Sequence, residues 1–192
     1  MNTDQIAITL DFTPNPNTLK FVVNRSFLER GAANFTDVSK TEFSPLAKKM
    51  FGIPGVQAVM IGTNFVTITK ASNGNWDVLA EEVPKTIEMH LQANLPAFDA
   101  SYVAEAPVAT SASSAEHMAI EEKIREVLDN EIRPAVAMDG GDIIFGKFED
   151  GIVYLQLQGS CSSCPSSVAT LKMGVESRLR DVIPEVKEVV QM

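Results

Sequence analysis

Residues 104–115 divide the chain into two halves. Nine of these twelve residues are Ala, Ser or Thr, and none is a large apolar residue. Such a segment buries too little apolar surface to offset the entropy of ordering its backbone, and it is typical of a flexible linker. We therefore expect two small domains, at residues 1–100 and 116–192, joined by a flexible Ala/Ser-rich linker at 101–115.

The amino-terminal half contains both the period-two pattern of strands and the longer period of helices. Ser44 followed by Pro45 predicts a helix start, because Ser caps helices well and Pro fits their first turn. Pro84 inside the last predicted helix should kink it or mark its true start. In chain order we expect strands at 6–12 and 19–23, a helix at 45–51, strands at 56–61 and 65–69, and a helix at about 77–94. The order is β-β-α-β-β-α.

The carboxy-terminal half has a different order. The motif Ser113-x-x-Glu116 resembles a capping box at the start of a helix that should end near Arg133 and Pro134. A turn with two glycines, at 138–142, follows it. The remaining predicted elements are strands at 143–148 and 152–157, a helix at 166–181 and a strand at 186–190. The order is α-β-β-α-β, so we expect two small α+β domains.

The chain of 192 residues has a formal net charge of −9, which argues against nucleic acid as a partner. Residues 1–104 carry 10 acidic and 8 basic side chains, and residues 105–192 carry 15 and 8. The acidic half either keeps the protein soluble or docks basic partners. We expect no membrane association, because no apolar run approaches the length that spans a bilayer, and no signal or transit peptide at the start.

Both cysteines of the chain lie two residues apart, in Gly159-Ser160-Cys161-Ser162-Ser163-Cys164-Pro165. They fall between a predicted strand and a predicted helix. Two thiolates at this spacing can bind one soft metal centre or form one small disulfide loop. Zinc sites and iron–sulfur clusters usually need about four protein ligands. One chain supplies two thiols, so a second chain completes the site or the pair performs thiol redox chemistry.

The residues around Cys161 and Cys164 suit a metal site. A following helix favours the thiolate at its amino-terminal end, and Pro165 fits the first turn. The neighbouring serines offer hydroxyl donors to a cluster. Four interpretations stay open at this point: an iron–sulfur site, a thioredoxin-like dithiol oxidoreductase, a zinc-bridged dimer and an inert surface pair. The Ser-Ser pair between the cysteines and the missing aromatic residue before them count against the oxidoreductase.

Other polar residues give weaker signals. His90 and His117 are isolated on predicted helices, and we expect them at the surface or at the edge of a core. Asp139 and Asp142 flank a pair of glycines, which predicts a turn rather than catalysis. The methionines and the single Trp76 are expected to pack. The sequence contains no phosphate-binding loop, Ser-His-Asp set or paired carboxylates at a telling spacing.

Several of these motifs together resemble a known family. Arg133-Pro134, the run Asp139-Gly140-Gly141-Asp142 and the cysteine motif closely resemble the carboxy-terminal NifU-like (Nfu) domain. The segments 13–21 and 65–70 resemble the amino-terminal domain that accompanies it in Nfu proteins of mitochondria and some bacteria. The resemblance covers nearly the whole chain except the linker.

The resemblance implies an iron–sulfur cluster scaffold or carrier and not an enzyme. Cys161 and Cys164 would be the ligands, and with their copies in a second chain they would hold a bridging 4Fe-4S cluster. The implied partners are a second copy of the chain when the cluster is bound, apo iron–sulfur client proteins and upstream assembly proteins. The implied location is the cytoplasm of a bacterium, or a compartment such as the mitochondrial matrix in a eukaryote.

Overall fold

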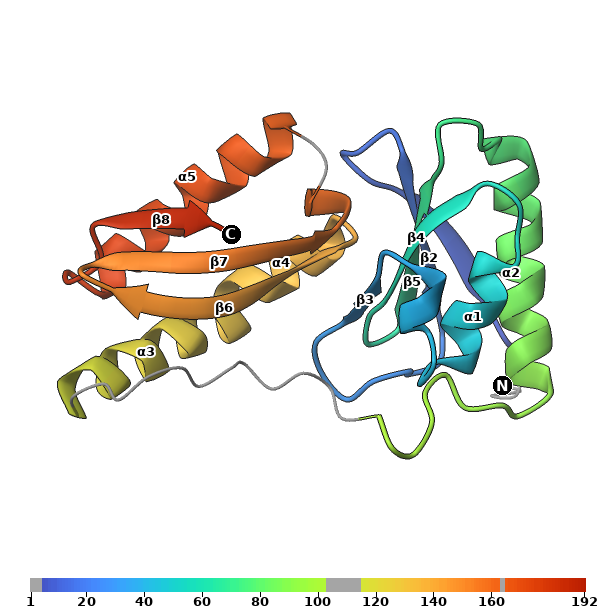
Figure 1. Cartoon of the computed structure of the whole chain (residues 1–192), viewed down its shortest axis with the longest axis horizontal. Helices are drawn as coiled ribbons and strands as arrows, with labels where there is room; N and C mark the ends of the chain where they lie inside the picture. The colour runs from blue at the N-terminus through green and yellow to red at the C-terminus, as the bar shows by residue number, and fades with distance from the viewer. Residues whose placement is uncertain (1–4, 103–114, 163–164) are drawn as a thin grey trace. The chain divides into compact units, whose positions relative to one another are not determined.

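The computed structural model describes residues 5–102, 115–162 and 165–192. Contacts between Cα atoms divide the chain into an amino-terminal unit, Met1–Ala104, and a carboxy-terminal unit, Glu105–Met192 (Figure 1). Each unit has its own hydrophobic core. Most of the expected linker, residues 103–114, lies outside the described residues. Tyr102 packs against the core of the amino-terminal unit, where its ring stacks on Phe98 with centroids 4.3 Å apart.

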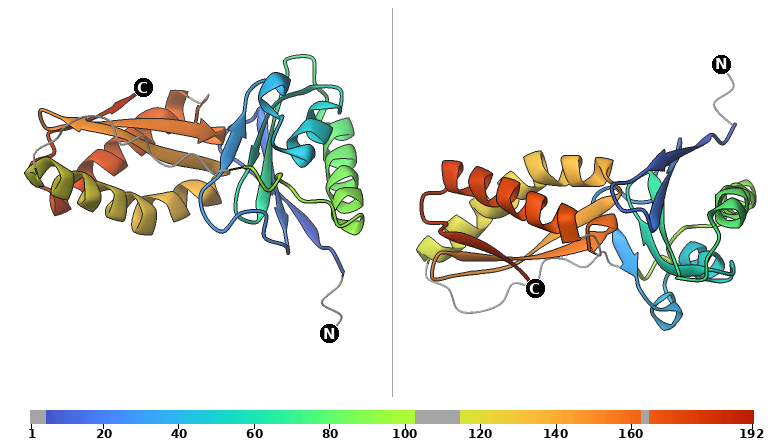
Figure 2. Two further views of the ribbon diagram at one scale, coloured as in Figure 1. Left: turned by 60° about the horizontal axis from the view of Figure 1, so that its bottom comes forward. Right: turned by 90° about the horizontal axis from the view of Figure 1, so that it is seen from above.

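The amino-terminal unit is a five-stranded antiparallel sheet with helices on one face (Figures 1 and 2). The strand order is β1-β2-β5-β4-β3. Buried apolar side chains of the strands meet those of the two α-helices and form the core. The elements are β1 (Ile8–Phe12), β2 (Thr18–Val23), β3 (Ala33–Phe35), a 3-10 turn (Val38–Lys40), α1 (Pro45–Phe51), β4 (Val56–Ile61), β5 (Phe65–Lys70) and α2 (Trp76–Gln92).

Local signals account for the helices of this unit. Ser44 caps α1 as predicted, because its Oγ accepts a hydrogen bond from the N–H of Ala47 at 3.2 Å. Helix α2 begins at Trp76, capped by Asn75, and continues through Pro84. The proposal that Pro84 marks the true start of this helix is therefore wrong. The short strand β3 is an addition to the expected element order.

The carboxy-terminal unit is a three-stranded sheet in the order β6-β7-β8, with its helices packed on one face (Figure 2). Strands β6 and β7 form an antiparallel hairpin, while β8 lies parallel to β7. Asp150 and Gly151 turn the hairpin with φ angles of +54° and +86°, as a tight two-residue turn requires. The elements are α3 (Ala115–Val127), a π turn (Leu128–Ile132), α4 (Arg133–Met138), β6 (Gly141–Glu149), β7 (Ile152–Gly159), a 3-10 turn (Ser160–Ser162), α5 (Pro165–Val182) and β8 (Glu188–Gln191).

The first helical segment of this unit is longer than predicted. The sequence suggested an end near Arg133 and Pro134, but the backbone passes through the π turn and continues as α4 to Met138. A π turn inserts an extra residue per turn, and Pro134 stands at the start of the new helix, where its missing N–H is tolerated. The residue Ser113 of the predicted capping box lies outside the described residues. The fold class is α+β, as expected.

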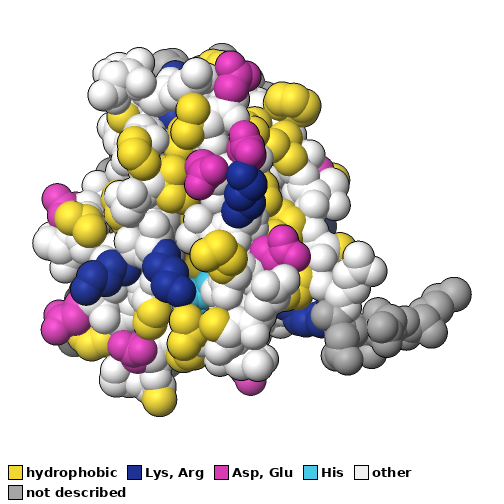
Figure 3. All heavy atoms as spheres, turned by 90° about the vertical axis from the view of Figure 1, so that its right-hand side faces the viewer, with side chains coloured by type: hydrophobic (Ala, Val, Ile, Leu, Met, Phe, Trp, Pro, Cys, Tyr) yellow, Lys and Arg dark blue, Asp and Glu magenta, His cyan; other side chains and the backbone are white. Residues whose placement is uncertain are grey.

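Charges of both signs are mixed on the helix-bearing face of the amino-terminal unit. Figure 3 shows acidic and basic side chains interspersed with hydrophobic ones on this face. On α2, for example, Lys85 Nζ lies 2.6 Å from Glu81 Oε1 and 3.4 Å from Glu82 Oε1. Within the residues that the structure describes, none of the helices is both long enough and apolar enough to cross a membrane.

Candidate functional site

Cys161 lies where the hairpin strand β7 gives way to helix α5. Gly159 ends β7 with a φ of +64°, a conformation that favours glycine, and turns the chain into the 3-10 turn Ser160–Ser162. The Cys161 side chain is 5% exposed and belongs to the core of the carboxy-terminal unit. Cys164, the other predicted ligand, lies outside the described residues and directly precedes Pro165, the first residue of α5.

Ser160 ties the cysteine turn to the turn before β6. Its N–H donates to Gly140 O at 3.2 Å, and its hydroxyl donates to Asp139 O. Gly140 allows this approach with a φ of +75°. Two turns separated by twenty residues in sequence are thereby held together. The position of Cys161 thus depends on the Asp139–Gly140 turn as well as on its own loop.

Gly141, the first residue of β6, lies directly against the sulfur of Cys161. A Cβ atom at this position would lie 2.5 Å from Cys161 Sγ, 3.0 Å from Gln158 O and 3.1 Å from Cys161 Cβ. Non-bonded heavy atoms prefer separations of about 3.5–4 Å. The thiol therefore occupies the space that a side chain at residue 141 would need.

An ion pair fixes the same end of β6. Arg133 donates from Nε to Asp142 Oδ1 and to Ile143 O, both at 3.1 Å, and from Nη2 to Asp142 Oδ2 at 3.3 Å. Its Nη1 also donates to Asp129 Oδ1 at 2.8 Å. The carboxylate of Asp142 accepts a further bond from the N–H of Ile143 at 2.8 Å. Arg133 thus links the π turn, the start of α4 and the start of β6.

Asp142 is a buried strand residue, and its predicted role in a turn is wrong. Its side chain is 7% exposed. Burial raises the pKa of this carboxyl, while the charge and hydrogen bonds of Arg133 and the N–H of Ile143 oppose that rise. The turn itself is formed by Asp139, which caps α4, and by Gly140. Each glycine has its own role, since Gly140 provides the conformation and Gly141 provides the space.

The hydroxyls of Ser160 and Ser162 are engaged by the protein itself. The hydroxyl proton of Ser160 goes to Asp139 O, and Ser162 donates to Gly159 O at 2.8 Å. Ser160 Oγ lies 3.7 Å from Cys161 Sγ. Either atom can be the donor in that contact. These bonds compete with donation to a cluster, and the role of the two serines toward a cluster stays a prediction.

The two histidines lie in different units and in different environments. His90 is fully buried, contrary to the expectation of a surface or core-edge position. Its Nε2 donates to Pro96 O at 3.0 Å, and Nδ1 has no hydrogen-bond partner among the described residues. Burial lowers the pKa of His90, with Lys49 adding to the effect and the carbonyl of Pro96 opposing it. His117 is exposed, and the centroid of its ring lies 5.8 Å from that of the Phe148 ring.

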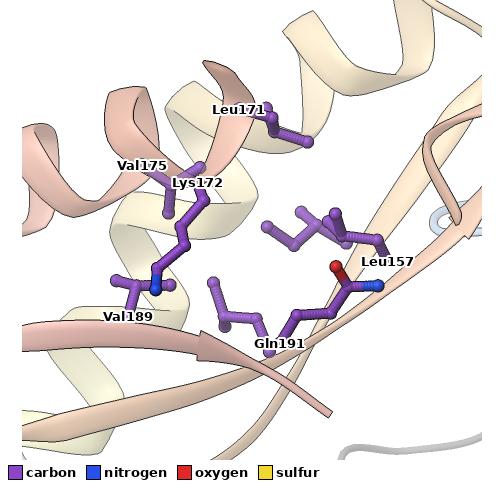
Figure 4. A pocket seen from close by; sticks show the side chains of 8 residues that line it. Leu157, Leu171, Lys172, Val175, Val189 and Gln191 are labelled. Carbon is purple, nitrogen blue, oxygen red and sulfur yellow. The ribbon is translucent and has the colours of Figure 1, made fainter. Parts of the chain in front are cut away.

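An apolar pocket lies between α5 and the sheet of the carboxy-terminal unit (Figure 4). Its empty volume, which includes open solvent, is about 260 Å³. Its lining residues are Ile143, Leu155, Leu157, Leu171, Lys172, Val175, Val189 and Gln191. In the described part of the chain, no three His, Cys, Asp or Glu side chains come together as a metal site.

Two relationships at the site escaped the sequence reasoning. The contact of Gly141 with Cys161 joins residues twenty positions apart, and the pair Arg133–Asp142 joins a helix to a strand. The pair of glycines was the available signal. It indicated a need for backbone freedom, while only one of the two glycines has a positive φ.

Two family models match the chain. Residues 8–94 match the model described as "Scaffold protein Nfu/NifU N terminal", and residues 124–190 match the NifU-like domain. The first match lies within the amino-terminal unit and the second within the carboxy-terminal unit, with Cys161 and Cys164 inside the second.

Curated relatives match over most of the chain. The chain is 42% identical over 181 residues to the human protein named NFU1 iron-sulfur cluster scaffold homolog, mitochondrial, covering 94% of this chain and 69% of the relative. It is 42% identical over 182 residues to NifU-like protein 4, mitochondrial, of Arabidopsis thaliana, covering 93% of this chain and 63% of the relative. The chain therefore spans about two thirds of the length of these relatives.

A solved structure also resembles the chain. It is a solution structure of a NifU-like protein from Saccharomyces cerevisiae, 26% identical, with a TM-score of 0.46 over 53% of this chain and 92% of that one. By the two family models and the 42% identity to the human relative, the chain belongs to the NifU-like (Nfu) iron–sulfur cluster scaffold family.

Proposed function

We propose that the chain is a non-catalytic carrier that holds a 4Fe-4S cluster between two copies of itself and passes it to apo-proteins. The ligands are Cys161 and Cys164 of each copy. The cluster is cargo in this proposal, bound in one step and released in another. The observation that carries the proposal is the position of Cys161, at the junction of β7 and α5 in a unit that matches the NifU-like domain.

Ligand counting supports the shared site. An iron–sulfur cluster is held by about four cysteine thiolates, and this chain contains two cysteines. Two copies supply four. In this proposal client thiolates replace the four cysteine ligands one at a time, by ligand exchange. No general base is needed for such an exchange of ligands.

The amino-terminal unit contains no cysteine and recognises client or upstream assembly proteins in this proposal. The curated relatives described above are named as mitochondrial proteins. We accordingly propose a role like that of the mitochondrial members, in a compartment that keeps thiols reduced. The alternative of a bacterial cytoplasm finds no support in these names.

Anaerobic reconstitution with iron and sulfide tests the proposal. The wild-type chain should gain the visible absorption of a 4Fe-4S cluster and then activate an apo-enzyme that needs one. Cys161→Ser and Cys164→Ser should each lose both properties while keeping the circular dichroism spectrum of the wild type. Retention of the cluster by either variant would contradict the assignment of the ligands.

Two other functions predict different results. A thioredoxin-like oxidoreductase reduces a protein disulfide in the metal-free state and depends more on Cys161 than on Cys164. A zinc-bridged dimer binds zinc in preference to iron and sulfide and transfers nothing. Neither rival has a specific observation in its favour.

A further inference from the structure

We propose that Gly141 is a positioning residue for Cys161, and that it acts by leaving out a side chain where the thiol lies. The inference rests on the proposed function in assigning Cys161 as a ligand. It goes beyond that function by naming a residue outside the cysteine loop that controls where the ligand sulfur is held. That control sets how well the thiol is shielded in the metal-free chain and how firmly the cluster is bound in the loaded one.

The requirement at Gly141 is for space and not for conformation. Gly140 and Gly159 have positive φ angles, and a larger residue would be strained there. Gly141 is not among the residues with positive φ, so alanine can adopt its backbone conformation. What excludes alanine is the sulfur of Cys161, 2.5 Å from the place of its Cβ. The added methyl group cannot move freely, because Gln158 O lies 3.0 Å away on the partner strand.

The surroundings hold this space open. Gly141 pairs with Gly159 across the hairpin, so the two strands meet without side chains beside Cys161. The next residue, Asp142, is bound by Arg133, which fixes the start of β6. Ser160 joins the cysteine turn to Asp139 and Gly140. Because the backbone is fixed from both sides, the easiest response to a methyl group at residue 141 is rotation of the Cys161 side chain out of its buried position.

Two consequences follow from that rotation. In the metal-free Gly141→Ala chain the thiol should react faster with alkylating reagents than in the wild type, since cysteine reactivity depends on exposure. In the loaded dimer the sulfur of Cys161 no longer has a fixed position, and a ligand that is not held in place by packing binds its metal less firmly.

The first test measures thiol accessibility in the full-length, metal-free chain. All variants carry Cys164→Ser, so that Cys161 is the one remaining thiol. We expect Gly141→Ala to raise the rate of alkylation by iodoacetamide about tenfold or more, because the sulfur loses its shielding. Gly146→Ala is the matched control in the same strand, where the added methyl group meets the flexible end of Met192 and lies 3.1 Å from Tyr154 O, a backbone contact like that of Gly141 with Gln158 O. It should alkylate at the parental rate. A folded Gly141→Ala variant that also does so would overturn the proposal.

A double-mutant cycle covers the case in which Gly141→Ala fails to fold. If the clash is with the sulfur, Cys161→Ala removes it, and Gly141→Ala should destabilise the chain much less in the Cys161→Ala background than in the parental one. An equal loss of stability in both backgrounds would also overturn the proposal.

A third readout separates this inference from the proposed function. With both cysteines present, the reconstituted Gly141→Ala chain should lose its cluster to a chelator faster than the wild type and the Gly146→Ala control. Equal rates of loss would contradict the positioning role. If the wild-type chain binds no cluster at all, the proposed function fails, while alkylation and the double-mutant cycle still decide the role of Gly141.

Discussion

Arg133 and Asp142 form a two-point ion pair at the start of β6, with Nε 3.1 Å from Oδ1 and Nη2 3.3 Å from Oδ2. The Asp142 side chain is 7% exposed and that of Arg133 27%. Asp142 directly follows Gly141, so the ion pair lies next to the space that holds the Cys161 sulfur. Its removal should affect both the stability of the carboxy-terminal unit and the cysteine site.

Arg133→Met should destabilise the carboxy-terminal unit at neutral pH. It leaves the buried carboxylate of Asp142 without its cation, which costs about 3–5 kcal/mol in comparable buried pairs. The pKa of Asp142 is already raised by burial and should rise further without Arg133. Asp142 of the variant then binds a proton more readily in the folded state than in the unfolded state. The loss of stability caused by Arg133→Met should therefore shrink as the pH falls from 7 toward 5.

Asp142→Asn is the control for this prediction. It removes the buried charge but keeps the shape of the side chain, so its penalty should be smaller and nearly independent of pH. Denaturant unfolding followed by circular dichroism at several pH values measures both variants. A penalty for Arg133→Met that stays constant between pH 7 and pH 5 would show that an uncompensated Asp142 charge is not its cause.

The amino-terminal unit should lose stability in mild acid because of His90. Burial lowers the folded pKa of this histidine below the unfolded value of 6.5. The contribution of neutral His90 to the free energy of unfolding is therefore complete above pH 6.5. It is lost as the pH falls from 6.5 toward the folded pKa. One proton is involved, so the slope is at most about 1.4 kcal/mol per pH unit.

The single tryptophan makes this prediction easy to measure. Trp76 begins α2 and packs on the core of the amino-terminal unit, so its fluorescence reports the unfolding of that unit. The slope below pH 6.5 should become flatter in His90→Gln. It should persist in His117→Gln, which removes an exposed histidine of the other unit. An unchanged slope in His90→Gln would assign the effect to another group.

Ser44→Ala should destabilise the amino-terminal unit by about 1–3 kcal/mol. The fully buried hydroxyl accepts from the N–H of Ala47 and donates to Ala97 O at 2.8 Å, so it caps α1 and fixes the segment after α2. Ser72→Ala, at an exposed turn serine, is the control and should change stability by less than about 0.5 kcal/mol. Trp76 fluorescence during denaturant unfolding compares the two. Equal stabilities would mean that the Ser44 hydroxyl contributes nothing net.

The sequence predicted those elements whose signals are local. Ser44 and Pro45 marked the start of α1, and the strands expected at 143–148 and 152–157 lie within the β6–β7 hairpin. The three-residue strand β3 has too few residues for its period to be recognised. The burial of His90 depends on the segment after α2, which provides Pro96 as its partner.

At the cysteine site, too, local features could be predicted from the sequence and long-range contacts could not. The motif around Cys161 identified the chemistry, because the two cysteines are close in sequence. The contact of Gly141 with Cys161 and the pairing of Arg133 with Asp142 arise only when helix, hairpin and loop are assembled. The period of a single helix or strand does not reveal such contacts, since they join residues on separate elements.

The central claim is that two chains share one cluster through Cys161 and Cys164. Native mass spectrometry of the anaerobically reconstituted, full-length chain tests it most directly. The account predicts a monomer-to-dimer shift on loading, with a dimer that carries four irons and four sulfides, and no such species for Cys161→Ser or Cys164→Ser. A 4Fe-4S cluster bound to a monomer without added thiol, or a loaded dimer that forms without these cysteines, would contradict it.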